Sequence, residues 1–156
     1  MYRRHVLEHI NDPNNYIKKC AKLLNKNGKL IIEVPNMNSW LAKKARYNWL
    51  ALDLDNHTNH FSKKSLKKLL EQNNFKIKTI SYFSPEQSPF DLLQTVLNLF
   101  FKEHNYLFKM MKHELKVNRP HYLLSISIYP FALTVAFIFG LLKQGSIIKV
   151  YSEKVI

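Results

Sequence analysis

The chain has 156 residues, and its 46% hydrophobic content is too apolar for a disordered tail and sufficient for a domain with its own core. Its three glycines stand at positions 28, 140 and 145, which excludes a glycine-rich phosphate loop of the P-loop or G-x-G-x-x-G kind. Cys20 is the single cysteine, which excludes an intrachain disulfide and a cysteine-based zinc cluster and favours a cytoplasmic location.

The formal net charge is +13, from 24 basic and 11 acidic residues. A positive field of this size favours anionic partners such as phospholipid head groups or nucleic acid, although lysine-rich composition without a ligand gives the same number. The lysines are spread over every segment and are not gathered on one element. This dispersal argues against a nucleic-acid partner.

The first expected element is a helix that begins at Pro13 and has Asp12 as its N-cap. Apolar residues recur at helical spacing over 17–24, and Gly28 is expected to end the segment in the left-handed conformation. The apolar, β-branched run 29–34 then predicts an interior strand of a parallel sheet.

The region between this strand and Ser62 has no clear period, which indicates loop and short helix. Ser62 is typical of an N-cap, and a leucine stripe predicts a helix that ends at 73–74. Residues 75–83 alternate apolar and lysine side chains, as in a half-buried strand with Phe75 and Phe83 on one face. The order helix, strand, helix, strand predicts an α/β fold.

The composition changes after Pro85. Residues 120–142 contain no Lys, Arg, Asp or Glu, and this run is long enough to cross a bilayer. Pro130 lies at its middle, so a true span competes with a helical hairpin that enters one leaflet and with a buried helix pair. We expect contact with the inner face of the cytoplasmic membrane. Residues 146–154 alternate and predict a final strand.

Several short phrases stand in a fixed order in the first half of the chain. Residues 5–10, 11–13, 23–30 and 34–36 read HVLEHI, NDP, LLNKNGKL and VPN, and residues 53–75 read DLDNHTNHFSKKSLKKLLEQNNF. The series resembles the class I S-adenosylmethionine-dependent methyltransferases, in the branch that includes quinone-biosynthesis O-methyltransferases. The resemblance covers residues 5–84. It implies a Rossmann-like α/β sheet whose last, antiparallel strand is 146–154, with S-adenosylmethionine as the cofactor.

In that family, the glycine-rich turn and the acidic residue that hold the cofactor precede the first of these phrases. The resemblance therefore implies that residues 1–84 are the C-terminal half of a methyltransferase domain. Residues 85–142 would be an apolar helical, membrane-associating insert, and residues 143–156 would contain the final strand of the sheet. The cofactor site is then expected to be incomplete in this chain, with an N-terminal partner chain as one way to complete it.

His5, Glu8 and His9 stand at i, i+3 and i+4, which would place them on one face of a helix. Read literally, H-x-x-E-H is the inverted zincin pattern. The resemblance implies instead an E-x-x-E-H magnesium site in which His5 replaces a glutamate, and magnesium prefers oxygen ligands. In a third interpretation, which we favour, the three residues line the mouth of the cofactor site and bind no metal.

His57 and His60 belong, by the resemblance, to the lid on the acceptor side. A neutral imidazole there could accept the proton of an acceptor hydroxyl during methylation, so both are candidate catalytic bases. The alternative is that they hydrogen-bond a loop together. Trp40, Tyr47 and Trp49 could form an aromatic wall for the acceptor or belong to the core.

The sequence and the resemblance together predict S-adenosylmethionine-dependent methyl transfer, by a partial enzyme, to a hydroxyl of a small, lipid-linked or membrane-borne acceptor. The alternative from a different functional class is a non-catalytic, membrane-associated fragment.

Overall fold

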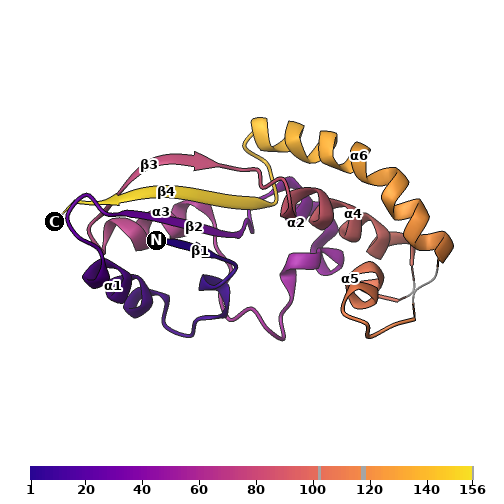
Figure 1. Ribbon diagram of the computed structural model, residues 1–156, viewed down its shortest axis with the longest axis horizontal. Coiled ribbons are helices and arrows are strands. Elements are labelled where there is room, and N and C mark those ends of the chain that lie inside the picture. The colour runs from indigo at the N-terminus through magenta and orange to yellow at the C-terminus, as the bar shows by residue number, and fades with distance from the viewer. Residues whose placement is uncertain (102, 117–118, 156) are drawn as a thin grey trace.

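The computed structural model describes residues 1–101, 103–116 and 119–155 (Figure 1). The strands are β1 (Tyr2–Arg4), β2 (Lys29–Pro35), β3 (Phe75–Ser81) and β4 (Ile147–Lys154). The helices are α1 (Pro13–Leu23), α2 (Trp40–Ala45), α3 (Lys63–Glu71), α4 (Gln87–Phe100), α5 (Tyr106–Met111) and α6 (Arg119–Leu141), with 3-10 turns η1 (Leu7–His9), η2 (Arg46–Asn48) and η3 (Leu50–Leu52).

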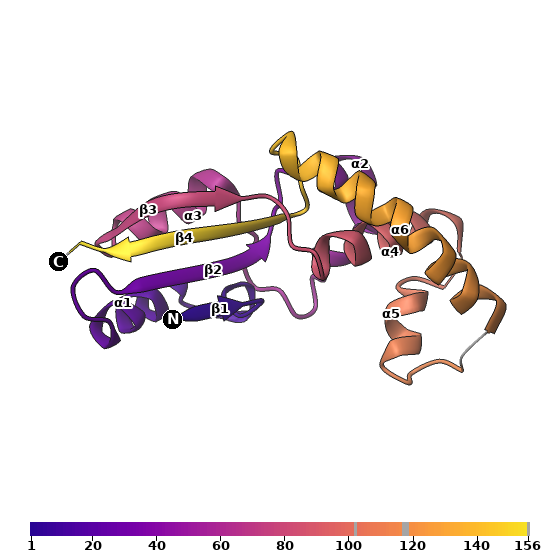
Figure 2. The same cartoon turned by 45° about the horizontal axis from the view of Figure 1, so that its top comes forward.

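The strands form one mixed sheet in the order β1-β2-β4-β3. β1 is parallel to β2, whereas β4 is antiparallel to both of its neighbours, β2 and β3. Helices α1 and α3 pack on one face of the sheet, and α2, α4, α5 and α6 lie beyond one end of its strands (Figures 1 and 2). The predicted α/β fold, with an apolar helix before an antiparallel last strand, is confirmed.

The helix α1 and the strand β2 match the elements predicted from the sequence, with two differences. The Asp12 carboxylate accepts a hydrogen bond from the Asn15 amide at 3.0 Å, as expected of an N-cap. The left-handed residue after α1 is Asn27, with φ 64°, and the prediction for Gly28 is wrong. Gly28 instead provides space, because a Cβ there would lie 2.7 Å from the Asn25 carbonyl oxygen. β2 is interior as predicted, but it is parallel only to β1.

The next helix is capped as predicted, by Ser62, whose hydroxyl accepts from the Ser65 amide at 3.1 Å. The register of β3 shifts between Ile77 and Thr79. This irregularity reverses the alternation, so the prediction that Phe83 shares the face of Phe75 is wrong. The Phe83 ring contacts Phe137 of α6, with 5.4 Å between the ring centroids.

Residues between β3 and β4 form the helices α4, α5 and α6, which share a second apolar cluster. α6 is one continuous helix through Pro130, so the helical hairpin is wrong. Proline removes only one backbone donor, the one that would pair with the Ile126 carbonyl, so a long helix can continue through it. Ala132 and Ala136 of α6 are buried, whereas the large apolar side chains Phe131 and Ile138 are exposed.

Candidate functional site

A cavity of about 700 Å³ lies at the carboxyl ends of the parallel strands β1 and β2. In open α/β sheets this edge is the usual place for a ligand. The cavity is lined by residues from the sheet end (His5, His9, Pro35, Ile147), from η3 and the loop after it (Leu50, Ala51, Asp53, Asp55, Asn56, His57) and from α4, α5 and their flanks (Gln87, Asn105, Phe108, Lys109, Lys112, Glu114).

The three-residue face predicted for His5, Glu8 and His9 does not form. The helical segment is only η1, Leu7–His9, and His5 precedes it with a φ of 48°. His5 and His9 line the cavity, and Glu8 is fully buried. The Nδ1 atom of His5 lies 3.0 Å from Glu8 Oε1, while His9 Nδ1 donates to the Asn56 carbonyl at 2.9 Å. The two histidines therefore have different partners.

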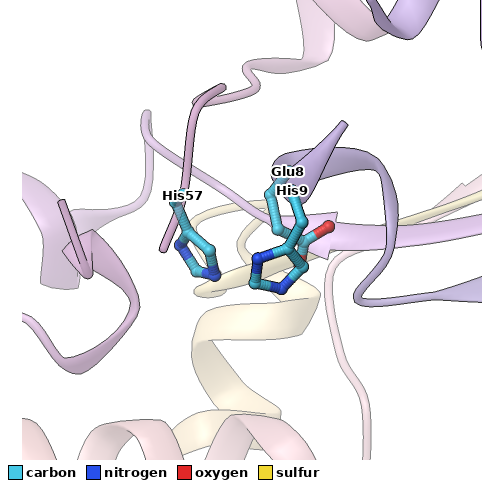
Figure 3. A group of neighbouring side chains, drawn as sticks. All are labelled: Glu8, His9 and His57. Atoms are coloured by element: carbon cyan, nitrogen blue, oxygen red, sulfur yellow. The ribbon is translucent and has the colours of Figure 1, made fainter. Parts of the chain in front are cut away.

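Glu8 and His9 are joined by His57, which comes from a distant part of the sequence (Figure 3). One potential ligand atom from each of the three residues lies within 4.8 Å of the others. Ligand atoms on one zinc ion are closer together, about 3–3.5 Å, so these side chains would have to rotate inward to hold a metal. Glu8 Oε2 is buried without a hydrogen-bond partner. The group therefore has an unused acceptor beside two imidazoles.

The two histidines expected to act as bases have different environments. His57 lines the cavity, and its Nδ1 donates to the Ala51 carbonyl at 3.0 Å. Burial lowers the pKa of His57 despite the raising effects of that hydrogen bond and of Glu8. The neutral tautomer therefore keeps Nε2 as a proton acceptor. His60 donates from Nε2 to the Leu52 carbonyl at 2.8 Å and does not line the cavity. This environment matches the alternative in which the histidine hydrogen-bonds a loop together.

The aromatic residues proposed as one wall are separated. Trp49 is buried in a cluster with Leu41, whereas Tyr47 is 81% exposed. Trp40 stacks on Phe139 of α6, with ring centroids 5.0 Å apart. The wall interpretation is therefore wrong, and only Trp49 belongs to the core.

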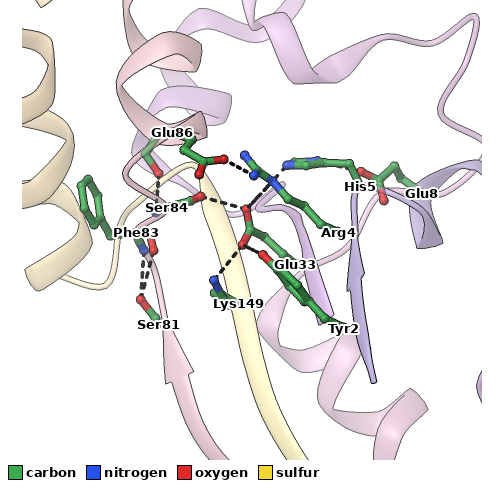
Figure 4. Close-up of polar contacts among 11 residues, drawn as sticks. Tyr2, Arg4, His5, Glu8, Glu33, Ser81, Phe83, Ser84, Glu86 and Lys149 are labelled. Carbon is green, nitrogen blue, oxygen red and sulfur yellow. Dashed lines mark hydrogen bonds and ion pairs between the residues drawn. The ribbon is translucent and has the colours of Figure 1, made fainter. Parts of the chain in front are cut away.

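The sequence analysis missed Glu33, a buried carboxylate at the centre of a polar cluster on β2 (Figure 4). Glu33 accepts hydrogen bonds from the Tyr2 hydroxyl at 2.7 Å and the Ser84 hydroxyl at 2.8 Å, and it pairs with Arg4 Nε at 3.3 Å and Lys149 Nζ at 3.2 Å. A glutamate inside an otherwise apolar strand was the available signal, because a buried charge requires partners.

These contacts determine the charge of Glu33. Burial would raise the pKa of this carboxyl, but the hydrogen bonds from Tyr2 and Ser84 and the charge of Lys149 outweigh burial and lower it. Glu33 is therefore ionised at neutral pH. His5 Nε2 lies 3.7 Å from Glu33 Oε1, which places the Glu33 cluster directly beside the histidine-lined cavity.

A family model described as a methyltransferase domain matches residues 1–80, more than half of the 156 residues. This chain belongs to that methyltransferase-domain family. Membership supports S-adenosylmethionine as the cofactor, as the resemblance implied. A search of curated proteins found no match.

Solved structures of methyltransferases align with this chain over nearly its whole length. Phosphoethanolamine N-methyltransferase 2 of Haemonchus contortus, in complex with S-adenosyl-L-methionine, aligns with 99% of this chain at 14% identity and a TM-score of 0.50. A SAM-dependent methyltransferase of Thermotoga maritima, described as a possible histamine N-methyltransferase, aligns with 98% of it at 12% identity and a TM-score of 0.49. The chain spans 33% of the first protein and 54% of the second.

Proposed function

We propose that this methyltransferase domain takes part in methyl transfer from S-adenosylmethionine to a hydroxyl group of a lipid-linked or membrane-borne acceptor. The observation that carries the proposal is the position of His57. Its imidazole lines the cavity at the carboxyl ends of β1 and β2, and burial lowers its pKa. An uncharged imidazole with one free nitrogen is suited to accept a hydroxyl proton at neutral pH.

The polar groups of the cavity fit a cationic cofactor in part. Asp53 and Asp55 line the cavity together with Lys109 and Lys112. The Oε2 atom of Glu8, which is buried behind the lining residues, and Nε2 of His5 have no hydrogen-bond partner. S-adenosylmethionine carries a sulfonium and an ammonium group, and nearby carboxylates stabilise such cations. His5, Glu8 and His9 would therefore lie at the cofactor side of the cavity.

When bound, S-adenosylmethionine supplies an electrophilic methyl group and leaves as a neutral thioether. His57 would hold the acceptor hydroxyl through Nε2 and take up its proton as the new oxygen–carbon bond forms. The Ala51 carbonyl holds the other ring nitrogen and fixes the orientation of the imidazole. His9, whose ring centroid lies 4.8 Å from that of His57, packs edge to face against it and would limit ring movement.

The acceptor class is inferred from α6. Within the described residues, one helical segment, Tyr122–Leu141, is long enough and apolar enough to span a membrane. Its mean hydropathy is 2.0. Only 17% of its most apolar window is buried in the structure. An exposed apolar surface of this extent favours contact with lipid, here the inner face of the cytoplasmic membrane.

The partner chain expected from the resemblance stays a prediction. In the described sheet β1 is an edge strand, where a further strand would pair.

Methyl incorporation into lipid tests the proposal. The full chain is incubated with methyl-labelled S-adenosylmethionine and vesicles made from a total bacterial lipid extract. We expect His57→Gln to reduce labelling by at least about 100-fold, the usual range for loss of a general base. His113→Asn is the control, because the His113 side chain is exposed. Asparagine is chosen because it tolerates the positive φ of this position.

Equal labelling by the wild-type chain and His57→Gln would contradict the role of His57. If the chain binds S-adenosylmethionine in equilibrium dialysis and sediments with the vesicles but gives no labelling, the non-catalytic, membrane-associated alternative replaces the proposal.

A further inference from the structure

A second cavity, also of about 700 Å³, lies among α4, α5 and α6. Its walls are mostly apolar, and it lies within the size range of small-molecule sites, about 300–1,000 Å³. We call it the helix groove. It is lined by Arg4, Glu86, Gln87, Phe90, Leu93, Leu107, Phe108, Met111, Tyr122, Ser125, Ile126, Tyr129 and Pro130.

The helix groove adjoins the histidine-lined cavity. Gln87 of α4 and Phe108 of α5 line both of them. A single elongated molecule could therefore occupy both spaces, with an apolar part in the helix groove and a polar part near His57. The histidine-lined cavity carries most of the titratable side chains, and the helix groove carries most of the apolar surface.

The charges in the helix groove are neutralised locally. Among its lining residues, the charged ones are Arg4 and Glu86, which pair with each other, and Arg4 also pairs with Glu33. A charged ligand therefore gains little there, whereas a hydrocarbon chain gains from leaving water. Leu93 and Leu107, at 4% and 5% exposure, form the innermost apolar wall.

The outer surface of α6 indicates where such a chain comes from. Tyr122 and Ile126 of the helix groove lie on α6, and the exposed side of the same helix continues with Phe131 and Ile138. Residues 120–142 contain no charged side chain, whereas a protein interface normally has a polar rim. A lipid surface therefore fits the exposed side of α6 better than a protein partner does.

The contacts of α4 favour an orientation of α6 along the membrane surface. α6 packs on α4, and α4 also carries the buried polar side chains Asp91, Gln94 and Thr95. Thr95 accepts from the Leu50 amide at 3.1 Å, which ties α4 to the segment before His57. α4 also packs on α2, whose exposed Lys43 and Lys44 cannot enter the hydrocarbon, so α6 stays at the interface beside α4.

We propose that the helix groove binds the hydrocarbon tail of a membrane lipid or lipid-linked acceptor, which enters from the bilayer beside α6 and places its head group in the histidine-lined cavity. The inference rests on the proposed function for the identity of the head group. The tail site itself follows from the shared lining residues and the apolar walls.

Photo-cross-linking tests tail binding without any methyl donor. The full chain is bound to phosphatidylcholine and phosphatidylglycerol vesicles that contain a fatty acid with a diazirine near the end of its chain, and the cross-linked residues are identified by mass spectrometry. We expect cross-links at Leu93 and Leu107 in addition to the outer side of α6. A tail that remains in the bilayer would reach only the outer side of α6, and that result would overturn the proposal.

Two isoleucines of α6 provide matched variants. Ile126 lines the helix groove and is 52% exposed, whereas Ile138 lies outside it and is 49% exposed. Relative to cross-linking on the outer side of α6, Ile126→Gln should reduce cross-linking at Leu93 and Leu107 about fivefold, and Ile138→Gln should not. Equal effects of the two variants would overturn a specific tail site.

The outcome is separable from that of the methylation test. Cross-links at Leu93 and Leu107 without lipid methylation would support the tail site and contradict the proposed function. The chain could instead form a dimer in lipid-free buffer that Ile126→Gln dissociates, and show no cross-linking at Leu93 and Leu107. These two results together would assign the helix groove to a second copy of the chain and overturn the lipid proposal.

Discussion

The indole Nε1 of Trp49 donates a hydrogen bond to Asp91 Oδ2 at 3.0 Å, and both residues are buried. Trp49 directly precedes η3, in the segment that leads to His57, and Asp91 lies on α4. The pair therefore joins the wall of the histidine-lined cavity to the helices that form the helix groove. Burial raises the pKa of Asp91 to about 6, against the lowering effect of the indole N–H.

Trp49→Phe should destabilise the protein by about 1–3 kcal/mol at pH 8, because it keeps most of the ring but removes a donor from a buried carboxylate. The loss should be smaller at pH 5, where Asp91 is mostly protonated. Urea unfolding at the two pH values measures both quantities. Trp40→Phe is the control and should change stability by less than about 0.5 kcal/mol, because Trp40 is 42% exposed. Equal losses at both pH values would show that the effect of Trp49→Phe comes from packing alone.

Asp91→Asn should remove one component of the pH dependence of stability. The pKa of Asp91 in the folded chain, about 6, is above its ordinary value of 3.8. Its contribution to stability is therefore fully present below pH 3.8 and is lost as the pH rises through about 6. The difference in unfolding free energy between Asp91→Asn and wild type should grow in favour of the variant over this interval. Parallel curves from pH 4 to 7 would contradict the raised pKa.

His57→Gln should have the opposite pH signature. Burial lowers the pKa of folded His57 below its ordinary value of 6.5. The contribution of the neutral imidazole is present above about pH 6.5 and is lost as the pH falls through the lower, folded pKa. Urea unfolding from pH 8 to 5 should therefore show a smaller acid loss in His57→Gln than in wild type. An equal or larger acid loss in the variant would contradict the lowered pKa of His57 in the folded chain.

Glu33→Gln should cost about 2 kcal/mol or more, because Lys149 loses a charged partner and the amide cannot accept from all the present donors. The pKa of Glu33 is lowered, so this stabilisation is present above its ordinary pKa of 4.5 and is lost as the pH falls through the folded value. Thermal unfolding at pH 7 gives the size. Glu71→Gln, which removes an exposed pair with Lys67, should cost less than about 0.5 kcal/mol.

Gly145→Ala should destabilise the chain by about 3 kcal/mol or more, because a Cβ at this position would lie 1.8 Å from the Tyr82 carbonyl oxygen. Gly145 leads into β4 and Tyr82 follows β3, so neither backbone segment can move without disturbing the sheet. Gln144→Ala, at the preceding exposed position, is the control. Comparable melting temperatures for the two variants, measured by circular dichroism, would mean that the backbone around Tyr82 relaxes.

The sequence by itself determined the local elements. Asp12 and Ser62 cap helices through bonds to amides three residues further on, and the runs around β2 and β4 are apolar enough to be recognised as strands. Such features depend on neighbours within one turn or one strand, so a linear pattern contains them. The ordered phrases of the first half also led to the methyltransferase fold, which the family match supports.

Only the tertiary structure decided which side chains meet. His57 reaches Glu8 and His9 because the loop after η3 returns to the carboxyl end of β1, and Glu33 is ionised because Tyr2 and other distant residues converge on it. The faces of β3 depended on a register shift that no short-range period encodes. Contacts between residues far apart in the sequence arise from how sheet and helices pack, and the spacing of residues along the chain carries no record of that packing.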